Sequence, residues 1–419
     1  MSDVLCGAPG TPPAADTLGG HTAGQLLRLC EVAGLGGADA NAYARTLTEV
    51  LGPVARRRLD LPPPTPSFLS DDHTPVEFSI SFAAGEAPTL RVLLEPGSGV
   101  GDLAQSGRTG LRAIRELARR WDFSTDRLDE LEDLFLPPSP QGPFALWCAL
   151  ELRSGGVPKV KVYLNPAASG AARSAATVRE ALRRLGHRQA FAALPEADRH
   201  LFFALDLGDW EEPRVKVYSA HHDLSTAEAG GLSRMEGGPG PAEIEEFFHA
   251  AAGIGEGRDG RTDDGRNHED GRDSKVGRDG GVGRDGGVGR EGGVGGEGEG
   301  GVPLDRRPVQ TCHAFTETAS GLPGGFTVYV PVRDYVRHDG EALDRAVALL
   351  RRYGVDPTRL VEYLAATTSR RLEEGTGLIA YLALAHQRGR PPRVMVYLSS
   401  EGYAVRPPLV APRQGEPVH

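Results

Sequence analysis

The sequence predicts an α+β fold in which ten antiparallel strands form five hairpins and helices connect one hairpin to the next. Five short segments alternate Val or Leu with Arg, Lys or Tyr, and another strand-like segment precedes each of them across a short link that contains Gly or Pro. Between the hairpins lie stretches whose apolar residues recur at helical spacing. A hairpin with its helices is therefore a unit that recurs five times at roughly constant length.

The strands of each hairpin can be placed in order along the chain. The first strands are predicted at residues 76–82, 144–152, 201–207, 310–316 and 378–384. The second strands, which carry the alternating pattern, are predicted at residues 90–95, 159–163, 214–218, 327–330 and 393–397. Because side chains of a strand point alternately to its two faces, the Arg, Lys and Tyr residues of each second strand share one face.

This charged face is compatible with two arrangements. In an open, half-buried sheet the Val face would be covered and the charged face would be exposed to water. In a closed barrel with helices outside, the Val face would pack under the helices and the charged face would line a lumen. The second arrangement would create a cationic, tyrosine-walled chamber suited to a phosphorylated ligand.

The helical segments indicate one domain interrupted by an insertion. Helices are predicted at residues 103–121, 171–185, 242–251 and 341–353, and opening helices within 20–52, near 26–35 and 42–51. Residues 1–252 and 303–419 are predicted to form the single domain. Residues 253–302 repeat near-copies of Gly-Arg-Asp-Gly-Gly-Val, which offer too little apolar surface to fold, so we expect a disordered insertion there. A calcium-binding β-roll would need a higher density of aspartate.

Composition argues against several classes of function. The formal net charge of -10 argues against a general nucleic-acid binder, so any basic patch is local. The four cysteines form no C-x-x-C pair, which indicates reduced thiols rather than a zinc site or a disulfide framework. The sequence shows no signal peptide and no run of about 18 apolar residues. We expect a cytoplasmic monomer or homodimer that binds neither nucleic acid nor membrane.

Five motifs follow one another between residue 74 and the C-terminus. They are Thr74-Pro-Val-Glu-Phe-Ser79 with Leu90-Arg-Val-Leu-Leu-Glu-Pro96, then Lys161-x-Tyr163-x-x-Pro166, Arg214-x-Lys216-x-Tyr218, Tyr329-x-Pro331, and Tyr397-Leu398-Ser399. In this order they resemble the motifs of the dimethylallyltryptophan synthase family, in its bacterial form. The resemblance implies the αββα prenyltransferase barrel, in which ten antiparallel strands close on themselves with helices outside. It also implies transfer of a dimethylallyl group from dimethylallyl diphosphate to an indole carbon, with L-tryptophan as the expected acceptor.

The resemblance assigns roles to side chains on the charged face. The cations expected to hold the diphosphate are Arg91, Lys161, Arg214 and Lys216, and the tyrosines expected around the prenyl chain are Tyr163, Tyr218, Tyr329 and Tyr397. Tyrosine suits this position because its ring face stabilises a carbocation and its hydroxyl can donate to a phosphate oxygen. Further candidates on this face are Lys159, Thr327, Arg393 and Met395. Thr327 stands where the family commonly has Gln, so this chain offers a shorter hydroxyl there.

We expect neither a metal ion nor another cofactor. A departing diphosphate carries about three negative charges, which many enzymes neutralise with Mg²⁺ held by aspartates. The sequence contains no Asp-Asp-x-x-Asp, and the acidic run at 129–133 lies in a helical pattern, where a solvated helix face is expected. Fixed Arg and Lys side chains would then have to stabilise the leaving group.

Glu77 is the candidate catalytic residue. It shares a strand face with Ser79 and Ser81, and the resemblance implies that its carboxylate accepts a hydrogen bond from the indole N–H as the cation attacks. A glutamate on a surface strand edge is the plain structural alternative. Glu95 lies on the same face by alternation, and we expect it to pair with Arg91 or a neighbouring lysine.

Two other functions fit the same residues. A phenol or a cyclic dipeptide could replace tryptophan as the acceptor, although the Glu77 motif favours an indole. A non-catalytic barrel that sequesters a phosphorylated small molecule would need the cations, but it would have no use for a buried carboxylate beside an aromatic acceptor. The sequence does not predict which indole carbon is alkylated.

Overall fold

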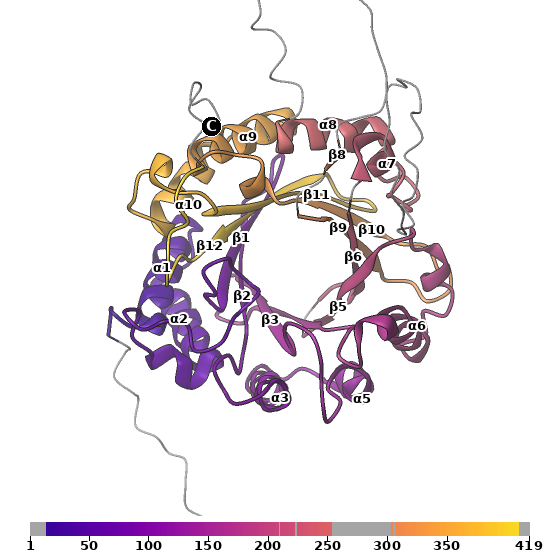
Figure 1. Cartoon of the computed structure of the whole chain (residues 1–419), viewed down its shortest axis with the longest axis horizontal. Helices are drawn as coiled ribbons and strands as arrows, with labels where there is room; N and C mark the ends of the chain where they lie inside the picture. The colour runs from indigo at the N-terminus through magenta and orange to yellow at the C-terminus, as the bar shows by residue number, and fades with distance from the viewer. Residues whose placement is uncertain (1–13, 209, 223, 254–302, 305–306, 410–419) are drawn as a thin grey trace, which may run out of the picture.

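Figure 1 shows the computed structural model of the chain, seen along the axis of a closed barrel of ten antiparallel strands. The structure describes residues 14–208, 210–222, 224–253, 303–304 and 307–409. Neighbouring strands form five hairpins, and β1 pairs with β12 from Glu77 opposite Ser399 to Ala83 opposite Arg393, which closes the ring. The predicted closed barrel is confirmed, and the open sheet is excluded.

The barrel strands lie close to their predicted positions. The first strands of the hairpins are β1 (Val76–Ala83), β3 (Leu146–Glu151), β5 (Arg199–Leu207), β9 (Val309–Phe315) and β11 (Ile379–Gln387). The second strands are β2 (Thr89–Leu94), β4 (Lys159–Leu164), β6 (Val215–His221), β10 (Gly325–Val330) and β12 (Arg393–Ser399). Their ends differ from the predicted ends by a few residues, as is usual where a strand gives way to a turn.

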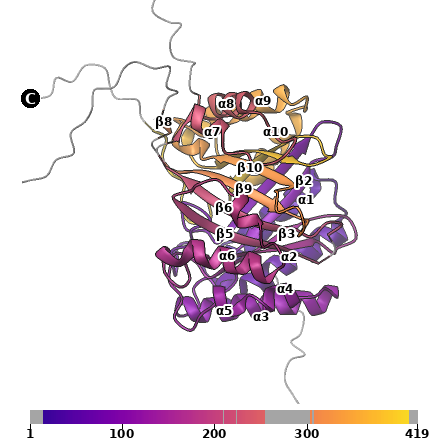
Figure 2. The same ribbon diagram turned by 90° about the vertical axis from the view of Figure 1, so that its right-hand side faces the viewer.

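Helices cover the outside of the barrel (Figures 1 and 2). The longer ones are α1 (Leu18–Val32), α2 (Gly37–Leu51), α3 (Leu103–Trp121), α6 (Ser174–Arg184), α8 (Pro241–Ala252), α9 (Asp339–Arg352) and α10 (Thr358–Thr367). The shorter ones are α4 (Asp126–Asp129), α5 (Glu132–Phe135) and α7 (Thr226–Gly230), with 3-10 turns η1 (Gly52–Arg56), η2 (Ala171–Arg173), η3 (Ala190–Ala193), η4 (Val332–Asp334) and η5 (Leu372–Glu374). The two opening helices begin earlier than predicted, and the side chain of Thr17 caps α1 by accepting from the Gly20 N–H.

The helix α3 shows how sequence pattern sets each outer helix. The Asp102 side chain accepts a hydrogen bond from the Gln105 N–H at the start of the helix, and Asp122 ends it in a left-handed conformation. Leu111, Ile114 and Leu117 recur at helical spacing and are buried, so this face packs on the barrel wall.

The hydrophobic core lies between the barrel and its helices. Phe78, Ile80, Val92, Val160 and Val162 point outward from their strands and are fully buried. Removal of apolar surface from water on this scale is the main stabilising contribution to a fold, at about 25 cal/mol per Å². The Val and Leu positions therefore hold the barrel together, and the opposite positions are left to line the lumen.

A short two-stranded ribbon includes the residues that directly follow the predicted insertion. β7 (Leu224–Ser225) pairs with β8 (Pro303–Leu304). Gly253 caps the C-terminal end of α8, and its φ of 66° favours glycine. The predicted disordered insertion at 253–302 lies outside the described residues apart from Gly253, and the division of the chain into one domain with an insertion stays a prediction.

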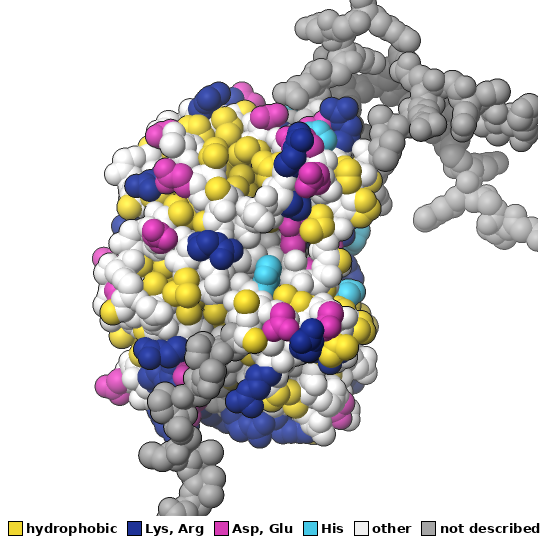
Figure 3. All heavy atoms as spheres, turned by 90° about the vertical axis from the view of Figure 1, so that its left-hand side faces the viewer, with side chains coloured by type: hydrophobic (Ala, Val, Ile, Leu, Met, Phe, Trp, Pro, Cys, Tyr) yellow, Lys and Arg dark blue, Asp and Glu magenta, His cyan; other side chains and the backbone are white. Residues whose placement is uncertain are grey.

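The outer surface carries charges of both signs. On the face formed by the elements at the left of Figure 1, basic and acidic side chains are scattered among hydrophobic ones (Figure 3). In the part of the chain that the structure covers, no helix has the length and apolar character needed to cross a membrane. Cys30, Cys148 and Cys312 are buried and free.

Candidate active site

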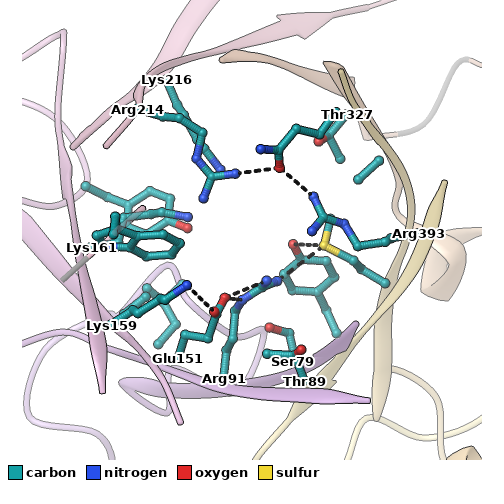
Figure 4. Close-up of a pocket in the computed structure, with 18 of the residues that line it drawn as sticks. Ser79, Thr89, Arg91, Glu151, Lys159, Lys161, Arg214, Lys216, Thr327 and Arg393 are labelled. Carbon is teal, nitrogen blue, oxygen red and sulfur yellow. Dashed lines mark hydrogen bonds and ion pairs between the residues drawn. The ribbon is translucent and has the colours of Figure 1, made fainter. Parts of the chain in front are cut away.

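The lumen contains two adjoining chambers. A barrel of eight strands is about filled by its own side chains, so ten strands leave room inside. The first chamber, here called the cationic chamber, lies toward the hairpin turns and contains basic side chains that point inward from several strands (Figure 4). Its basic lining residues are Arg91, Lys159, Lys161, Arg214, Lys216, Arg390 and Arg393.

The cations of β2 and β4 are tied to a carboxylate on the strand between them. Arg91 Nε and Nη2 both lie 2.8 Å from Glu151 Oε2, and Lys159 Nζ lies 4.0 Å from Glu151 Oε1. Glu151 is cross-strand from both residues, on β3. Burial alone would raise the pKa of Glu151, but the charge and hydrogen bonds of Arg91 lower it to about 2, so the carboxylate is ionised at neutral pH.

A second carboxylate stands behind the cations of β4 and β6. Asp206 on β5 accepts a hydrogen bond of 2.6 Å from Arg214 Nε and lies 3.6 Å from Lys161 Nζ. Burial alone would raise the pKa of Asp206, but the nearby positive charges lower it to about 2, and Lys161 makes the largest contribution to this decrease. Lys216 makes no ion pair with any described residue, and burial together with the charge of Arg214 holds its pKa well below the usual value.

Two residues outside the predicted set complete the chamber. Gln387 Oε1 accepts hydrogen bonds of 3.1 Å from both Arg214 Nη1 and Arg393 Nη2, which links β6 to β12. The ring of Trp210, in the turn between β5 and β6, lies 4.9 Å from Arg214, 5.0 Å from Lys159 and 5.5 Å from Lys161. These contacts fix the cations before any anion arrives.

The predicted tyrosines form a ring that lines both chambers. The ring centroids are 5.7 Å apart for Tyr163 and Tyr218, 6.0 Å for Tyr218 and Tyr329, and 5.8 Å for Tyr329 and Tyr397. Small residues stand cross-strand from them on the intervening strands. Ala204 is opposite Tyr163, Cys312 is opposite Tyr218 and Ala383 is opposite Tyr329, which leaves space for the rings.

The second chamber, here called the aromatic chamber, lies on the other side of the tyrosine ring. Trp147 stacks on Phe144 at 4.2 Å and lies 5.0 Å from Phe202. Phe68 and Leu69, in the segment before β1, also line this chamber. Planar aromatic surfaces at this spacing suit a flat aromatic ligand.

Glu77 lies where the two chambers meet. It points inward from β1, is 7% exposed and lines both chambers. Its carboxyl group makes no hydrogen bond or ion pair with the residues that the structure describes. Burial raises the pKa of Glu77 to about 8, an increase that the positive charge of Arg333 reduces. A buried acid with no protein partner is therefore available to a ligand.

Arg333 is the basic residue of the aromatic chamber among the described residues that line it. It is 5% exposed, its guanidinium lies 4.6 Å over the Tyr381 ring, and its Nε lies 3.2 Å from Asp71 Oδ2. Asp71 is shared with Arg307, at 2.7 Å, and with Arg406, at 3.7 Å. Three arginines thus share the single negative charge of Asp71. Arg333 is therefore not fully neutralised and can bind an anionic group of a ligand.

The structure brings together every residue that the sequence placed in the site. The four cations, the four tyrosines, Glu77, Lys159, Thr327, Arg393 and Met395 all line the cationic chamber. Their roles stay predictions. The expected partner of Glu95 is wrong: Glu95 Oε2 accepts from Ser67 Oγ at 2.5 Å, because β2 ends at Leu94 and the strand alternation no longer applies.

The acidic run at 129–133 is not part of the site. It divides between α4 and α5, and Asp129 and Glu132 pair with Arg115 on α3, at 2.5 Å and 2.7 Å. Among the residues with assigned positions, no group of three or more His, Cys, Asp or Glu side chains is arranged to hold a metal ion.

Comparison with known proteins identifies relatives across nearly the whole chain. Residues 38–364 match the family model of tryptophan dimethylallyltransferase. A ternary complex of prenyltransferase PriB with L-tryptophan and dimethylallyl thiolodiphosphate is 56% identical, with a TM-score of 0.82, covering 94% of this chain and 99% of that one. The 5-dimethylallyltryptophan synthase from Streptomyces coelicolor is 56% identical, with a TM-score of 0.81 and coverage of 94% and 100%. The 6-dimethylallyltryptophan synthase from Micromonospora olivasterospora is 41% identical, with a TM-score of 0.77 and coverage of 94% and 99%.

The raised pKa of Glu77 predicts a pH-dependent stability difference. The folded state holds the Glu77 proton up to about pH 8, whereas the unfolded chain releases it near 4.5, so wild-type stability falls between these values. Glu77→Gln removes this loss. We expect the melting temperature of the variant to match wild type near pH 5, to exceed it increasingly up to about pH 8, and to keep a constant excess above that pH. The exposed Glu116→Gln is the control in the same thermal unfolding series, and a Glu77→Gln difference that is constant with pH over the whole range would contradict the assignment.

Proposed function

The chain belongs to the tryptophan dimethylallyltransferase family, and we propose that it transfers a dimethylallyl group from dimethylallyl diphosphate to a carbon of the indole ring of L-tryptophan. One observation carries the proposal. Glu77, buried and without a protein partner, stands at the tyrosine ring that separates a cationic chamber from an aromatic one. A purely sequestering barrel would have no need of this carboxyl group.

The cationic chamber suits the diphosphate. Arg91, Lys161, Arg214 and Lys216 supply charge-assisted hydrogen bonds that strengthen as the C–O bond breaks and negative charge builds on the leaving group. Gln387 lines the same space, and its amide nitrogen can supply a donor in addition to the short hydroxyl of Thr327. We propose that these fixed cations do the work that Mg²⁺ does in other enzymes, so that no metal is needed.

The tyrosine ring suits the allylic cation. Its faces attract positive charge, each by about 0.5 to 2 kcal/mol, and the rings fill space that water would otherwise occupy. The hydroxyl groups stay protonated because burial raises the pKa of each of these tyrosines. They therefore donate hydrogen bonds to phosphate oxygen and do not act as nucleophiles toward the cation.

The aromatic chamber suits the acceptor. An indole between Trp147 and the tyrosine ring would place its N–H toward Glu77, which as a carboxylate raises the electron density of the ring. A new C–C bond to the allylic cation gives an arenium ion, and transfer of its ring proton to the released diphosphate restores aromaticity. Arg333 would bind the α-carboxylate, which favours an amino acid over a neutral phenol. The solved complexes of the relatives with tryptophan and a thiolodiphosphate analogue support this assignment. A cytoplasmic location and a monomeric or dimeric state stay predictions.

The proposed reaction is tested by incubating the purified protein with L-tryptophan and dimethylallyl diphosphate in EDTA. We expect a mono-dimethylallylated tryptophan by mass spectrometry, at the same rate with and without Mg²⁺. No product with tryptophan or with any indole or phenol acceptor would refute the prenyltransferase assignment. Product only after addition of Mg²⁺ would refute the metal-free mechanism and leave the activity standing.

Glu77→Gln is expected to lower turnover by about a hundredfold or more, because the amide still accepts a hydrogen bond but carries no charge to stabilise the arenium ion. In the wild type, kcat/KM should rise with pH through about 8 as free Glu77 ionises, and this limb should be lost in the variant. Rates are measured by chromatography of the product, with Glu116→Gln as the matched control. A near-wild-type rate for Glu77→Gln would remove Glu77 from the mechanism.

Arg333→Met should weaken the use of acceptors that carry a carboxylate. A hydrogen bond to a charged group contributes about 1.5 to 3 kcal/mol, so we expect kcat/KM for L-tryptophan to fall about ten- to a hundredfold. Tryptamine lacks the carboxylate and serves as the internal control, because any effect through Glu77 acts on both acceptors alike. An equal fall for the two acceptors would show that Arg333 does not bind the carboxylate.

A further inference from the structure

A fully buried carboxylate, Asp206, lies directly behind the cations of the cationic chamber. A negative charge at this position is unexpected, because it opposes the binding of an anion. The side chain of Asp206 has 0% exposure and lines neither chamber, so it does not touch a ligand placed there. A buried ionised group is costly unless its partners are well placed. Asp206 can therefore affect a ligand in the chamber only through the cations in front of it.

The contacts of Asp206 reach two cations on the neighbouring strands. Asp206 is cross-strand from Lys161 on β4. Its Oδ2 accepts hydrogen bonds from Nε, at 2.6 Å, and from the backbone N–H, at 3.3 Å, of Arg214, the residue just before β6. Oδ1 lies 3.6 Å from Lys161 Nζ and makes no hydrogen bond with the described residues. Ala204, two residues earlier on β5, is opposite Lys216. One carboxylate thus stands among the cations of two strands.

Lysine is otherwise almost absent from this protein. The chain has four lysines, Lys159, Lys161, Lys216 and Lys275, and three of them line the cationic chamber. Apart from the histidines, its remaining basic residues are arginines, which stay charged under all ordinary conditions, whereas a buried lysine readily loses its proton. The site therefore contains three of the four lysines of this chain, whose charge depends on their surroundings.

We propose that Asp206 is a positioning residue that holds Arg214 in place and keeps Lys161 and Lys216 protonated in the empty chamber, so that the diphosphate meets a site already charged. The identity of the ligand, dimethylallyl diphosphate, rests on the proposed function. The binding half of the proposal stands on its own, because it concerns a diphosphate anion and not the transfer reaction.

The ionisation of Lys161 depends on groups from every side. Burial and the charges of Arg214 and Arg91 lower the pKa of Lys161, while Asp206 and Glu151 raise it. The charged or titratable groups around this cluster are Arg91 of β2, Glu151 of β3, Lys159 and Tyr163 of β4, Arg214 just before β6, Lys216 and Tyr218 of β6, Cys312 of β9, Arg393 and Tyr397 of β12, and Arg127 of α4. Asp206 is the acid that forms an ion pair with Lys161, with 3.6 Å between Oδ1 and Nζ.

Neutralising Asp206 should have opposite effects at low and high pH. At low pH all the lysines are protonated, so loss of a negative charge strengthens the binding of an anion. At high pH Lys161 and Lys216 are neutral in the empty variant, and the anion binds only with uptake of protons. Uptake of one proton weakens affinity about tenfold for each pH unit. The two curves should cross, which simple damage to the fold would not produce.

The test is Asp206→Asn, which keeps the shape and one acceptor oxygen. Calorimetry with inorganic pyrophosphate is run from about pH 6.5 to pH 9 in buffers of different ionisation enthalpy, and the ionisation of the ligand itself cancels between variant and wild type. We expect tighter binding than wild type at the acid end, weaker binding at the alkaline end, and about one more proton taken up per pyrophosphate near pH 8. Parallel pH curves and equal proton uptake would overturn the proposal.

Two comparison variants separate position from charge. Asp206→Glu keeps the charge and should restore the wild-type pH slope, even if its longer side chain lowers affinity at every pH. Asp133→Asn removes an exposed carboxylate paired with Arg184 and should leave the pyrophosphate curve unchanged. A pH slope in Asp206→Glu as steep as in Asp206→Asn would show that charge is not the property that matters.

The wild-type protein also provides a test that needs no folded Asp206 variant. With ¹³C-labelled lysine the NMR spectrum should contain four Cε signals, which Lys→Arg variants assign. We expect Lys161 to be charged at pH 7.5 in the empty protein and, where Asp206→Asn folds, to titrate at least about one pH unit lower in that variant. A neutral Lys161 in the empty wild type at pH 7.5 would overturn the proposal. Failure of the transfer reaction alone, with these binding results intact, would overturn only the proposed function.

Discussion

The pairing of β1 with β12 is the constraint on which the rest of the structure depends. It turns a twisted sheet into a ring, so that the inward face of every strand borders the same lumen. Residues more than 300 positions apart, such as Ser79 and Tyr397, become cross-strand neighbours. Without closure, the basic and tyrosine residues would lie along a surface, where water would weaken each of their electrostatic interactions.

Closure also concentrates like charges, and the barrel wall compensates for this. Carboxylates alternate with cations from strand to strand, with Glu151 between Arg91 and Lys159 and Asp206 between Lys161 and Arg214. The chamber still keeps an excess of positive charge, because Lys216 and Arg393 have no carboxylate partner within hydrogen-bonding distance among the described residues. The ion pairs thus reduce the repulsion between cations in the empty chamber, and the remaining positive charge attracts an anion.

Local periodicity predicted the strands and the face that carries the site, and the resemblance of the five motifs to a known family predicted that the strands close into a barrel. Alternation within each second strand placed Arg91, Lys161 and the tyrosines correctly, because the two faces of a strand follow from the chain alone. The roles of Glu151 and Asp206 were not predicted, because they depend on which residues face one another on neighbouring strands, and this register cannot be read from the sequence. Arg333 and Trp210 lie in a 3-10 turn and a hairpin turn, where no period applies. The concentration of lysine in the site was a signal available in the composition.

The two chambers are bordered by different parts of the chain at opposite ends of the barrel. Exposed Glu211, Glu212 and Arg390, from hairpin turns, rim the cationic end, while Phe68, which is 58% exposed, lies at the aromatic end in the segment that leads into β1. Evolution can therefore modify the entrance for one reactant and leave the other intact. Such modularity would let a lineage of these barrels diversify its aromatic partners while conserving a common way of activating the donor.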